Sequence, residues 1–188
     1  MLERELSPDR DVKLVRLVAG RDEAAFEELV DRHQHSVLNT IHRYVGEYDA
    51  AADLAQEVFV IVWNKADRFR GQAKFSTWLY RVVVNQCLQY RRKRRRRPVV
   101  LSLDSVDPDR PPEALQVGDG REQADRVAAV RQALARLPDR QRIALVLSHY
   151  EGRSYAEVAG IMGTSASSVE SLLVRARAAL REQLGGLR

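Results

Sequence analysis

A run of basic side chains dominates the middle of the sequence. Between Arg68 and Arg97 there are eleven Lys or Arg residues and no Asp or Glu, and the segment ends in seven consecutive cations. The formal net charge of the whole chain is only +5, so the rest of the chain is net acidic. A nucleic-acid backbone is the commonest partner whose charge density rewards such a concentration. A solvated surface or a targeting peptide is the alternative, but the aromatic residues, glycine and helical apolar pattern of the same segment favour nucleic-acid binding.

Residues that could catalyse a reaction or bind a metal do not form a recognisable set. No metal-ligand spacing links the single cysteine, Cys87, to any of the four histidines, which are His33, His35, His42 and His149. No glycine-rich phosphate-binding loop is present either. The sequence therefore predicts a protein that is not an enzyme and that has no metal and no cofactor. A single cysteine is also typical of a reducing compartment.

Nothing in the sequence predicts export or membrane insertion. The N-terminus is charged from Glu3 onward and lacks the apolar core of a secretory signal. The longest wholly apolar run covers only residues 58–63, which is too short to span a bilayer. Hydrophobic residues make up 45% of the chain, as in a globular protein. We therefore expect a soluble cytoplasmic protein.

Three amphipathic helices are expected to carry the first half of the chain. Apolar residues at helical spacing indicate one helix between Asp22 and Gly46, a second over residues 50–65 and a third over residues 76–92. No segment alternates with the period of a strand, so the predicted fold class is all-α. The second helix has a stripe opposite its apolar side, formed by Asp53, Gln56, Glu57, Val60 and Asn64. The third helix has an exposed row, formed by Arg81, Asn85, Gln89 and Arg92.

A different composition marks residues 98–122. Prolines and glycines discourage regular structure there, and six acids face only two arginines. The sequence therefore predicts a flexible acidic linker. Its length fits a segment with a function of its own as well as a plain tether.

The second half of the chain has well-marked helix ends. An amphipathic helix is expected to stop at Pro138, and Asp139 is expected to cap the helix that follows. Ser154 and Glu157 have the spacing of a capping box at the start of a short helix. Gly163 stands where that helix would end in the left-handed conformation.

The last two helices have the spacing of a helix-turn-helix. Ala159, Gly163 and Val169 supply the small residue where the helices touch, the glycine of the turn and the branched residue that fixes the second helix. That second helix, over about 166–184, would enter the DNA major groove. Its exposed residues are expected to be Ser167, Glu170, Ser171, Val174, Arg175 and Ala178. Arg175 could contact guanine or phosphate, whereas Arg177 is expected nearer the core.

Together these motifs resemble the bacterial sigma factors of RNA polymerase, specifically the extracytoplasmic-function (ECF) group. The resemblance rests on the series DLAQEVF at 53–59 and FSTWLYR at 75–81, followed by Asn85 and by the helix-turn-helix. It implies two small helical domains joined by the flexible acidic linker. Their expected bounds are 10–97 for a region 2 helical bundle, 98–122 for the linker and 123–185 for a region 4 helix-turn-helix.

The resemblance also implies protein partners. Asp53, Gln56 and Glu57 would dock on a basic coiled coil of the largest, β′ subunit of core RNA polymerase, and contacts with the β subunit are expected as well. Two carboxylates and an amide on one rigid helix face suit the arginine side chains of a partner. Members of this group are commonly held by an anti-sigma factor, so such a partner is expected here.

Promoter DNA is the other partner that the resemblance implies. The loop over 70–75 and the helix after it would hold the unpaired strand of the −10 element, through Arg70, Lys74, Arg81, Asn85 and Arg92. Asn85 is the best candidate for a base-edge contact, because an amide can donate and accept together. Phe75 and Trp78 could stack on bases, but their spacing favours packing at the base of the helix.

The −35 element would be read by the last helix, through Ser167, Glu170, Ser171, Val174 and Arg175. Many family members carry a basic residue at the position of Glu170. A carboxylate there repels phosphate and could accept from a cytosine amino group, so a different preferred −35 sequence is expected.

Two other classes of protein explain only part of the sequence. A free-standing helix-turn-helix regulator accounts for residues 154–184 but not for the acid-free third helix or the stripe on the second. An RNA-binding protein leaves the helix-turn-helix unexplained. The sequence therefore favours a sigma factor that binds core RNA polymerase, directs it to promoters and promotes DNA opening.

Overall fold

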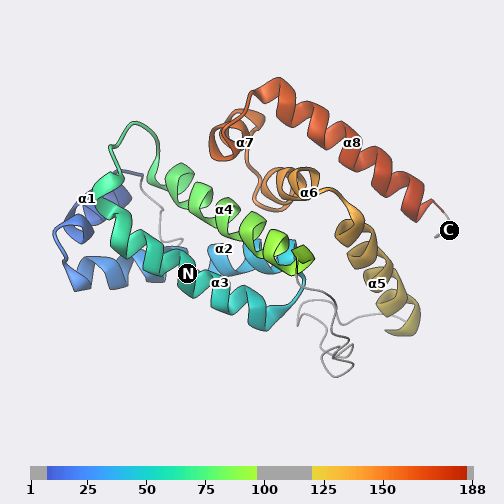
Figure 1. Ribbon diagram of the computed structural model, residues 1–188, viewed down its shortest axis with the longest axis horizontal. Coiled ribbons are helices and arrows are strands. Elements are labelled where there is room, and N and C mark those ends of the chain that lie inside the picture. The colour runs from blue at the N-terminus through green and yellow to red at the C-terminus, as the bar shows by residue number, and fades with distance from the viewer. Residues whose placement is uncertain (1–7, 97–119, 186–188) are drawn as a thin grey trace.

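The structure, a computed structural model, describes residues 8–96 and 120–185, and every regular element within them is helical (Figure 1). The fold class is therefore all-α, as predicted. The first half contains α1 (Pro8–Ala19), α2 (Glu23–Val45), α3 (Tyr48–Lys65), the short 3-10 turn η1 (Ala66–Arg68) and α4 (Phe75–Arg96). The second half contains α5 (Gly120–Arg136), α6 (Asp139–Leu145), the π-helical turn η2 (Val146–Tyr150), α7 (Tyr155–Met162) and α8 (Ala166–Leu184).

The three helices predicted for the first half are confirmed. The Asp22 side chain caps α2 by accepting a hydrogen bond from the N–H of Ala25 at 2.9 Å, and Gly46 ends that helix with a φ of 91°. The third helix continues past its predicted end at residue 92 to Arg96. Its last turn consists of cations, which interact favourably with the negative end of the helix dipole.

Helix α1 was not predicted from the sequence. Its apolar side is narrow, because Leu14, Val15 and Val18 are the buried apolar residues among the side chains that the structure describes in this helix. These three residues pack with α2 and η1 into the core of the first half. α1 is therefore held by tertiary contacts that a short periodic pattern does not reveal.

The helix ends of the second half agree with the prediction except at α6. The capping box of Ser154 and Glu157 is present, and Gly163 has φ 62° and ψ 45°. The prediction that Asp139 caps α6 was wrong, because Pro138 occupies the capping position and no side-chain cap is formed. The Asp139 carboxylate instead accepts a hydrogen bond from Nε of Arg91 at 3.1 Å. It therefore pairs with a cation of α4 rather than with the free backbone N–H groups at the start of α6.

Helix α5 begins inside the segment predicted as linker, residues 98–122, because it starts at Gly120. The rest of that predicted linker lies outside the described residues.

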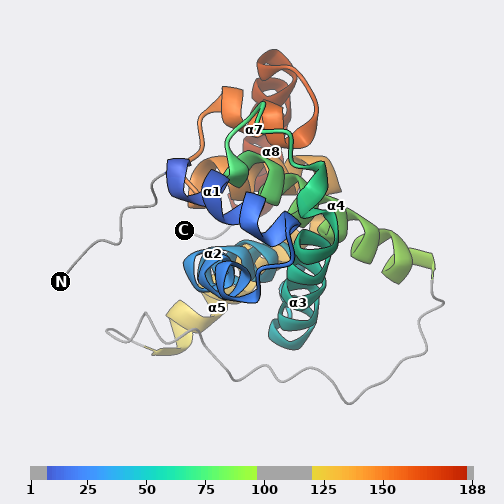
Figure 2. The same ribbon diagram turned by 90° about the vertical axis from the view of Figure 1, so that its left-hand side faces the viewer.

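The two halves of the chain pack against each other. Helix α7 lies beside the first turns of α4 in both views, and η2 contacts α2 (Figures 1 and 2). The buried apolar side chains form one continuous cluster that runs from Leu29 and Val83 in the first half to Val158 and Leu173 in the second. No helix in the part of the chain that the structure describes is long and apolar enough to cross a membrane.

Candidate protein and nucleic-acid interfaces

The predicted polymerase-binding residues form a stripe on the free side of α3. Asp53, Gln56 and Glu57, called here the docking stripe, are all exposed. The opposite side of α3 is fixed in the core, where Val58 and Val62 are fully buried. Two carboxylates and one amide are therefore held on a rigid surface and remain accessible to cationic side chains of another protein.

The loop between η1 and α4 leads into two packed aromatic residues at the start of α4, Phe75 and Trp78. Arg70 and Lys74 are exposed on this loop, and Gly71 makes its turn with a φ of 68°. Phe75 is only 1% exposed and meets Trp78 with ring centroids 5.8 Å apart. Trp78 is half-buried and packs against the same core. The interpretation that these two rings pack at the base of the helix is confirmed for the structure as it stands.

The predicted −10 residues of α4 share one face of that helix. Arg81, Asn85, Gln89 and Arg92, called here the α4 row, are all exposed. Cys87 on the other side is fully buried, and burial raises the pKa of its thiol to about 12, so it is an unreactive core residue. Two of the predicted −10 residues, Lys74 and Arg81, already have partners in the second half of the chain. The predicted −10 residues are thus exposed, and two of them also contact α7.

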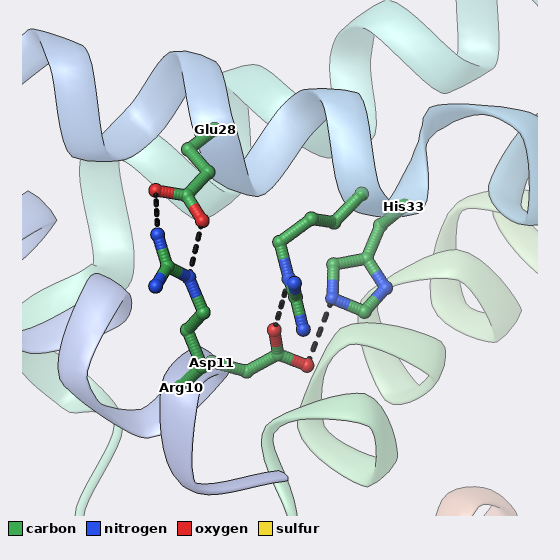
Figure 3. A network of polar contacts seen from close by, with 5 residues as sticks. Arg10, Asp11, Glu28 and His33 are labelled. Atoms are coloured by element: carbon green, nitrogen blue, oxygen red, sulfur yellow. Dashed lines mark hydrogen bonds and ion pairs between the residues drawn. The ribbon is translucent and has the colours of Figure 1, made fainter. Parts of the chain in front are cut away.

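A buried charged network between α1 and α2 packs against the start of α4, and sequence analysis missed it (Figure 3). Asp11 of α1 accepts from Nε of Arg32 at 2.8 Å and lies 3.0 Å from Nε2 of His33, both on α2. The His33 ring in turn packs on Phe75, with centroids 5.4 Å apart. Arg10 and Glu28 form a second pair between the same two helices at the surface.

Charge rather than burial decides the ionisation of Asp11. Burial by itself raises the pKa of this carboxyl, but the hydrogen bonds and positive charge of His33 and Arg32 outweigh it, so the net pKa lies below the usual value. The signal that could have found this network is the helical apolar pattern, which places His33 on the buried side of α2.

A second missed feature is a buried arginine where the two halves meet. Arg142 of α6 is 4% exposed; its guanidinium lies over the Tyr44 ring, and Nη2 donates to the carbonyl oxygen of Arg43 at 3.4 Å. Burial and the neighbouring Arg91 charge lower its pKa to about 10. An arginine would be expected at the surface, so only the fold reveals this contact.

The predicted −35 residues lie together on the free side of α8. Ser167, Glu170, Ser171, Val174 and Arg175, called here the reading face, are all exposed. Val169, Leu173 and Ala176 fix the opposite side in the core. Nε of Arg175 donates to the carbonyl oxygen of Ser171 at 3.1 Å, which holds the guanidinium along the helix. Arg177 was expected nearer the core, but it is exposed beside this face.

Known sequence families match both halves of the chain. Residues 29–97 match the family described as Sigma-70 region 2, and residues 128–180 match Sigma-70, region 4. The RNA polymerase sigma-H factor of Pseudomonas aeruginosa is 35% identical over 185 residues, which cover 95% of this chain and 96% of that protein. The ECF RNA polymerase sigma-E factor of Escherichia coli K12 is 34% identical over 181 residues, covering 90% and 92%.

Solved structures agree with these matches. CnrH in complex with the cytosolic domain of CnrY has a TM-score of 0.68 at 26% identity, over 94% of this chain and 97% of that one. The sigma factor RpoE in complex with the anti-sigma factor NepR, from Bartonella quintana, has a TM-score of 0.65 at 26% identity, over 87% and 98%. A free-standing regulator is not favoured, because the matches include the first half of the chain. The chain belongs to the RNA polymerase sigma factors of the ECF group, the initiation factors that bind core RNA polymerase and direct it to promoters.

Proposed function

We propose that this sigma factor docks on core RNA polymerase through the docking stripe, Asp53, Gln56 and Glu57, and that the site lies on the β′ subunit. The exposure of all three side chains on a rigidly packed helix is the observation that carries the proposal. A basic partner surface would place arginine forks against the two carboxylates. Contacts with the β subunit are proposed for other surfaces of the chain.

For the −10 element, we propose that the unpaired strand crosses the loop and the α4 row. Arg70, Lys74, Arg81 and Arg92 would contact phosphates, and Asn85 would contact a base edge. The exposure of all five side chains supports this assignment. The packed rings of Phe75 and Trp78 at the start of α4 would keep the strand outside the core. Extruding a base costs a few kcal/mol, which these contacts would have to offset.

For the −35 element, the reading face of α8 would lie in the major groove. Ser167, Ser171 and Arg175 offer donors to base edges or phosphates, and Glu170 offers an acceptor for a cytosine amino group. We further propose the domain bounds 10–97 and 123–185, joined by the linker at 98–122.

Two structural neighbours were solved in complexes, one of them with a protein named an anti-sigma factor. A likeness at TM-scores of 0.65 and 0.68 supports the proposal that an anti-sigma factor also holds this chain. We propose that it acts in the cytoplasm, as a specificity subunit without catalytic activity of its own.

Reversal of charge in the docking stripe tests the proposed function. The double variant Asp53→Arg with Glu57→Arg should lose binding to core RNA polymerase and therefore transcription from a promoter. The matched control is Glu23→Arg with Glu27→Arg, which reverses two exposed acids with the same spacing on α2. Its polymerase affinity should be that of the parent. A folded stripe variant that binds core polymerase as tightly as the control would place the dock elsewhere.

A further inference from the structure

A polar cavity lies where four segments of the chain meet. It has a volume of about 300 Å³, and its walls come from α1, α2, the start of α4 and the turn between η2 and α7. Phe75 and Tyr80 form part of the wall, and the other lining residues are polar or charged. Ligand pockets in proteins begin at about this volume and combine apolar walls with a few polar groups. What this cavity could bind depends on which of its polar groups already have partners.

Both carboxylates in the wall of the cavity are already paired. Asp11 accepts a hydrogen bond from Nε of Arg32 at 2.8 Å (Figure 3). Glu151 accepts from Nη1 of Arg43 at 3.1 Å and from the Tyr80 hydroxyl at 3.2 Å. Each carboxylate thus has a guanidinium beside it that offsets its negative charge. Neither acid is therefore left to bind a cation or to repel an anion unopposed.

Arg153 also lines the cavity, and one of its donors is unpartnered. Nε of Arg153 is shielded from solvent, and no atom of the described residues accepts a hydrogen bond from it. The guanidinium lies 3.9 Å from the centroid of the Tyr80 ring, but an aromatic ring attracts the charge without replacing an acceptor for the N–H group. A buried donor without an acceptor costs free energy, so it marks a place where an acceptor would bind favourably.

Further donors line the same cavity. Nζ of Lys74 lies 3.6 Å from a carboxylate oxygen of Glu157, which leaves other protons of the ammonium group for a second acceptor. Ser76 adds a hydroxyl and, in the first turn of α4, a backbone N–H that has no partner within the helix. That turn contains no acid. The cavity therefore combines two cations, a hydroxyl and the start of a helix, and each of these favours a negatively charged ligand.

The size of the cavity narrows the class of ligand. A water molecule occupies about 30 Å³ in the liquid, so the cavity has room for roughly ten groups of that size, which is more than inorganic phosphate fills. A small organic group attached to the phosphate could pack against the Phe75 ring. A phosphate monoester has a charge of about −1.5 to −2 at neutral pH, which matches two cations better than a carboxylate does. Arginine and lysine are also the usual protein partners of phosphate.

We propose that this cavity binds a small phosphate monoester, with Arg153 and Lys74 as the cationic contacts and Ser76 as a hydroxyl donor. The inference adds a small-molecule site to a chain whose proposed partners are macromolecules. Lys74 is also among the proposed −10 residues, whereas Arg153 and Ser76 belong to none of the proposed interfaces. A ligand in this cavity would contact segments that are distant in the sequence, so its binding should also stabilise the folded chain by mass action.

Nuclear magnetic resonance of the isotope-labelled full chain tests the site. Inorganic phosphate, glycerol phosphate and glucose phosphate are titrated separately, and sodium chloride at matched ionic strength is the control. The Nε–H signal of Arg153 and the backbone amide signal of Ser76 should shift and saturate with at least one of the two monoesters. Inorganic phosphate should bind several-fold more weakly than that monoester, because it fills less of the cavity. Chloride should not reproduce the shifts.

Substitutions locate the binding site. Arg153→Gln should weaken binding of the monoester at least about tenfold, because it removes a charged donor. Arg140→Gln makes the same change at an exposed position of α6 and should bind like the parent. If Arg153→Gln does not fold because the stacking on Tyr80 is lost, Lys74→Gln replaces it, since the Lys74 side chain is 62% exposed. Lys74→Gln should weaken binding several-fold, and Lys65→Gln at the exposed end of α3 is its matched control.

The outcomes decide the inference without polymerase or DNA. Saturable binding of a monoester that weakens in the cavity variants, and not in their controls, supports it. It is overturned by the lack of any saturable shift with phosphate or either monoester, by shifts that chloride reproduces, or by cavity variants that bind as tightly as their controls. The inference and the proposed function therefore succeed or fail separately.

Discussion

Helices α4 and α8 are both expected to face promoter DNA, yet the structure presents them in opposite ways. Helix α7 packs on α4, where a carboxylate oxygen meets Lys74 and a carbonyl oxygen meets Arg81. The reading face of α8 is exposed throughout, and it carries one acid, Glu170, and one base, Arg175. Two cations of the strongly basic surface thus have partners in α7, although both surfaces are exposed. This difference teaches that packing between the two halves engages cations on one of the two proposed DNA surfaces and leaves the other exposed.

The interactions that hold α4 and α8 in place also differ, and the largest expected change in stability comes from the buried network that packs against α4. Asp11→Asn removes the carboxylate that pairs Arg32 and His33 in the buried network, which should lower the free energy of unfolding by about 3 kcal/mol. The control is Asp31→Asn at an exposed position of α2, expected within about 0.5 kcal/mol of the parent. Urea unfolding measures both. Equal stability of the two variants would show that the network does not stabilise the fold.

Acid should weaken the stabilisation that the buried network of Asp11 provides. The pKa of Asp11 is lower in the folded chain than its ordinary value of 3.8, so folding favours the ionised carboxyl. Its contribution to stability is therefore complete above pH 3.8 and is lost as the pH falls through the lower folded value. The stability difference between the parent and Asp11→Asn should shrink over that interval in urea titrations. A difference that stays constant with pH would contradict the assignment.

Among the DNA-facing residues, Asn85→Ala should impair promoter opening by about 2 kcal/mol if its amide contacts an unpaired base. A pre-melted bubble in the template should reduce the deficit, because unpairing is then no longer driven by base capture. Gln89→Ala removes an amide one turn further along the α4 row and is the matched control. If the two variants open linear promoters equally well, the base contact belongs to the loop instead.

Arg175→Ala tests the reading face of α8. It should weaken binding to the −35 element by about 1–3 kcal/mol if the guanidinium reads a guanine, with the loss confined to one base position. A loss that is uniform across sequences, with the salt slope reduced by about one, would indicate a phosphate contact. Arg177→Ala is the control, because it removes an exposed arginine beside the reading face. Equal losses for both variants would show that α8 presents a different side to DNA.

The smallest expected effect is the loss of stability when the N-terminal cap of α8 is removed. The Ser165 side chain accepts from the N–H of Ser168 and so caps this helix. Ser165→Ala should cost about 1 kcal/mol of stability, and Ser165→Gly only a few tenths. Thermal unfolding of the two variants measures the difference. A glycine variant less stable than the alanine variant would show that the hydroxyl is not what holds the start of α8.

The sequence was sufficient for whatever depends on local periodicity. The exposure of the docking stripe, the α4 row and the reading face follows from helical spacing, and the ends of α2 and α7 follow from Asp22, Gly46, Ser154 and Gly163. These features need only one helix and its caps to be correct.

Contacts between distant segments were beyond sequence reasoning. Asp11, Arg142 and Asp139 all have charged side chains that a pattern assigns to the surface or to a cap, yet they join α1 to α2 and the second half of the chain to the first. Their roles depend on a partner elsewhere in the chain, which no local spacing specifies. The contacts of Lys74 and Arg81 with α7 were missed for the same reason.

Energy transfer between the two halves tests the central claim most directly. Donor and acceptor dyes on Lys93→Cys of α4 and Gln183→Cys of α8, both exposed positions, report the separation of the DNA-reading helices, and Cys87 is buried away from the labels. We expect efficient transfer in the free chain, because α7 packs on α4 and α8 packs on α7. Inefficient transfer in the folded free chain would contradict this packing of the two halves.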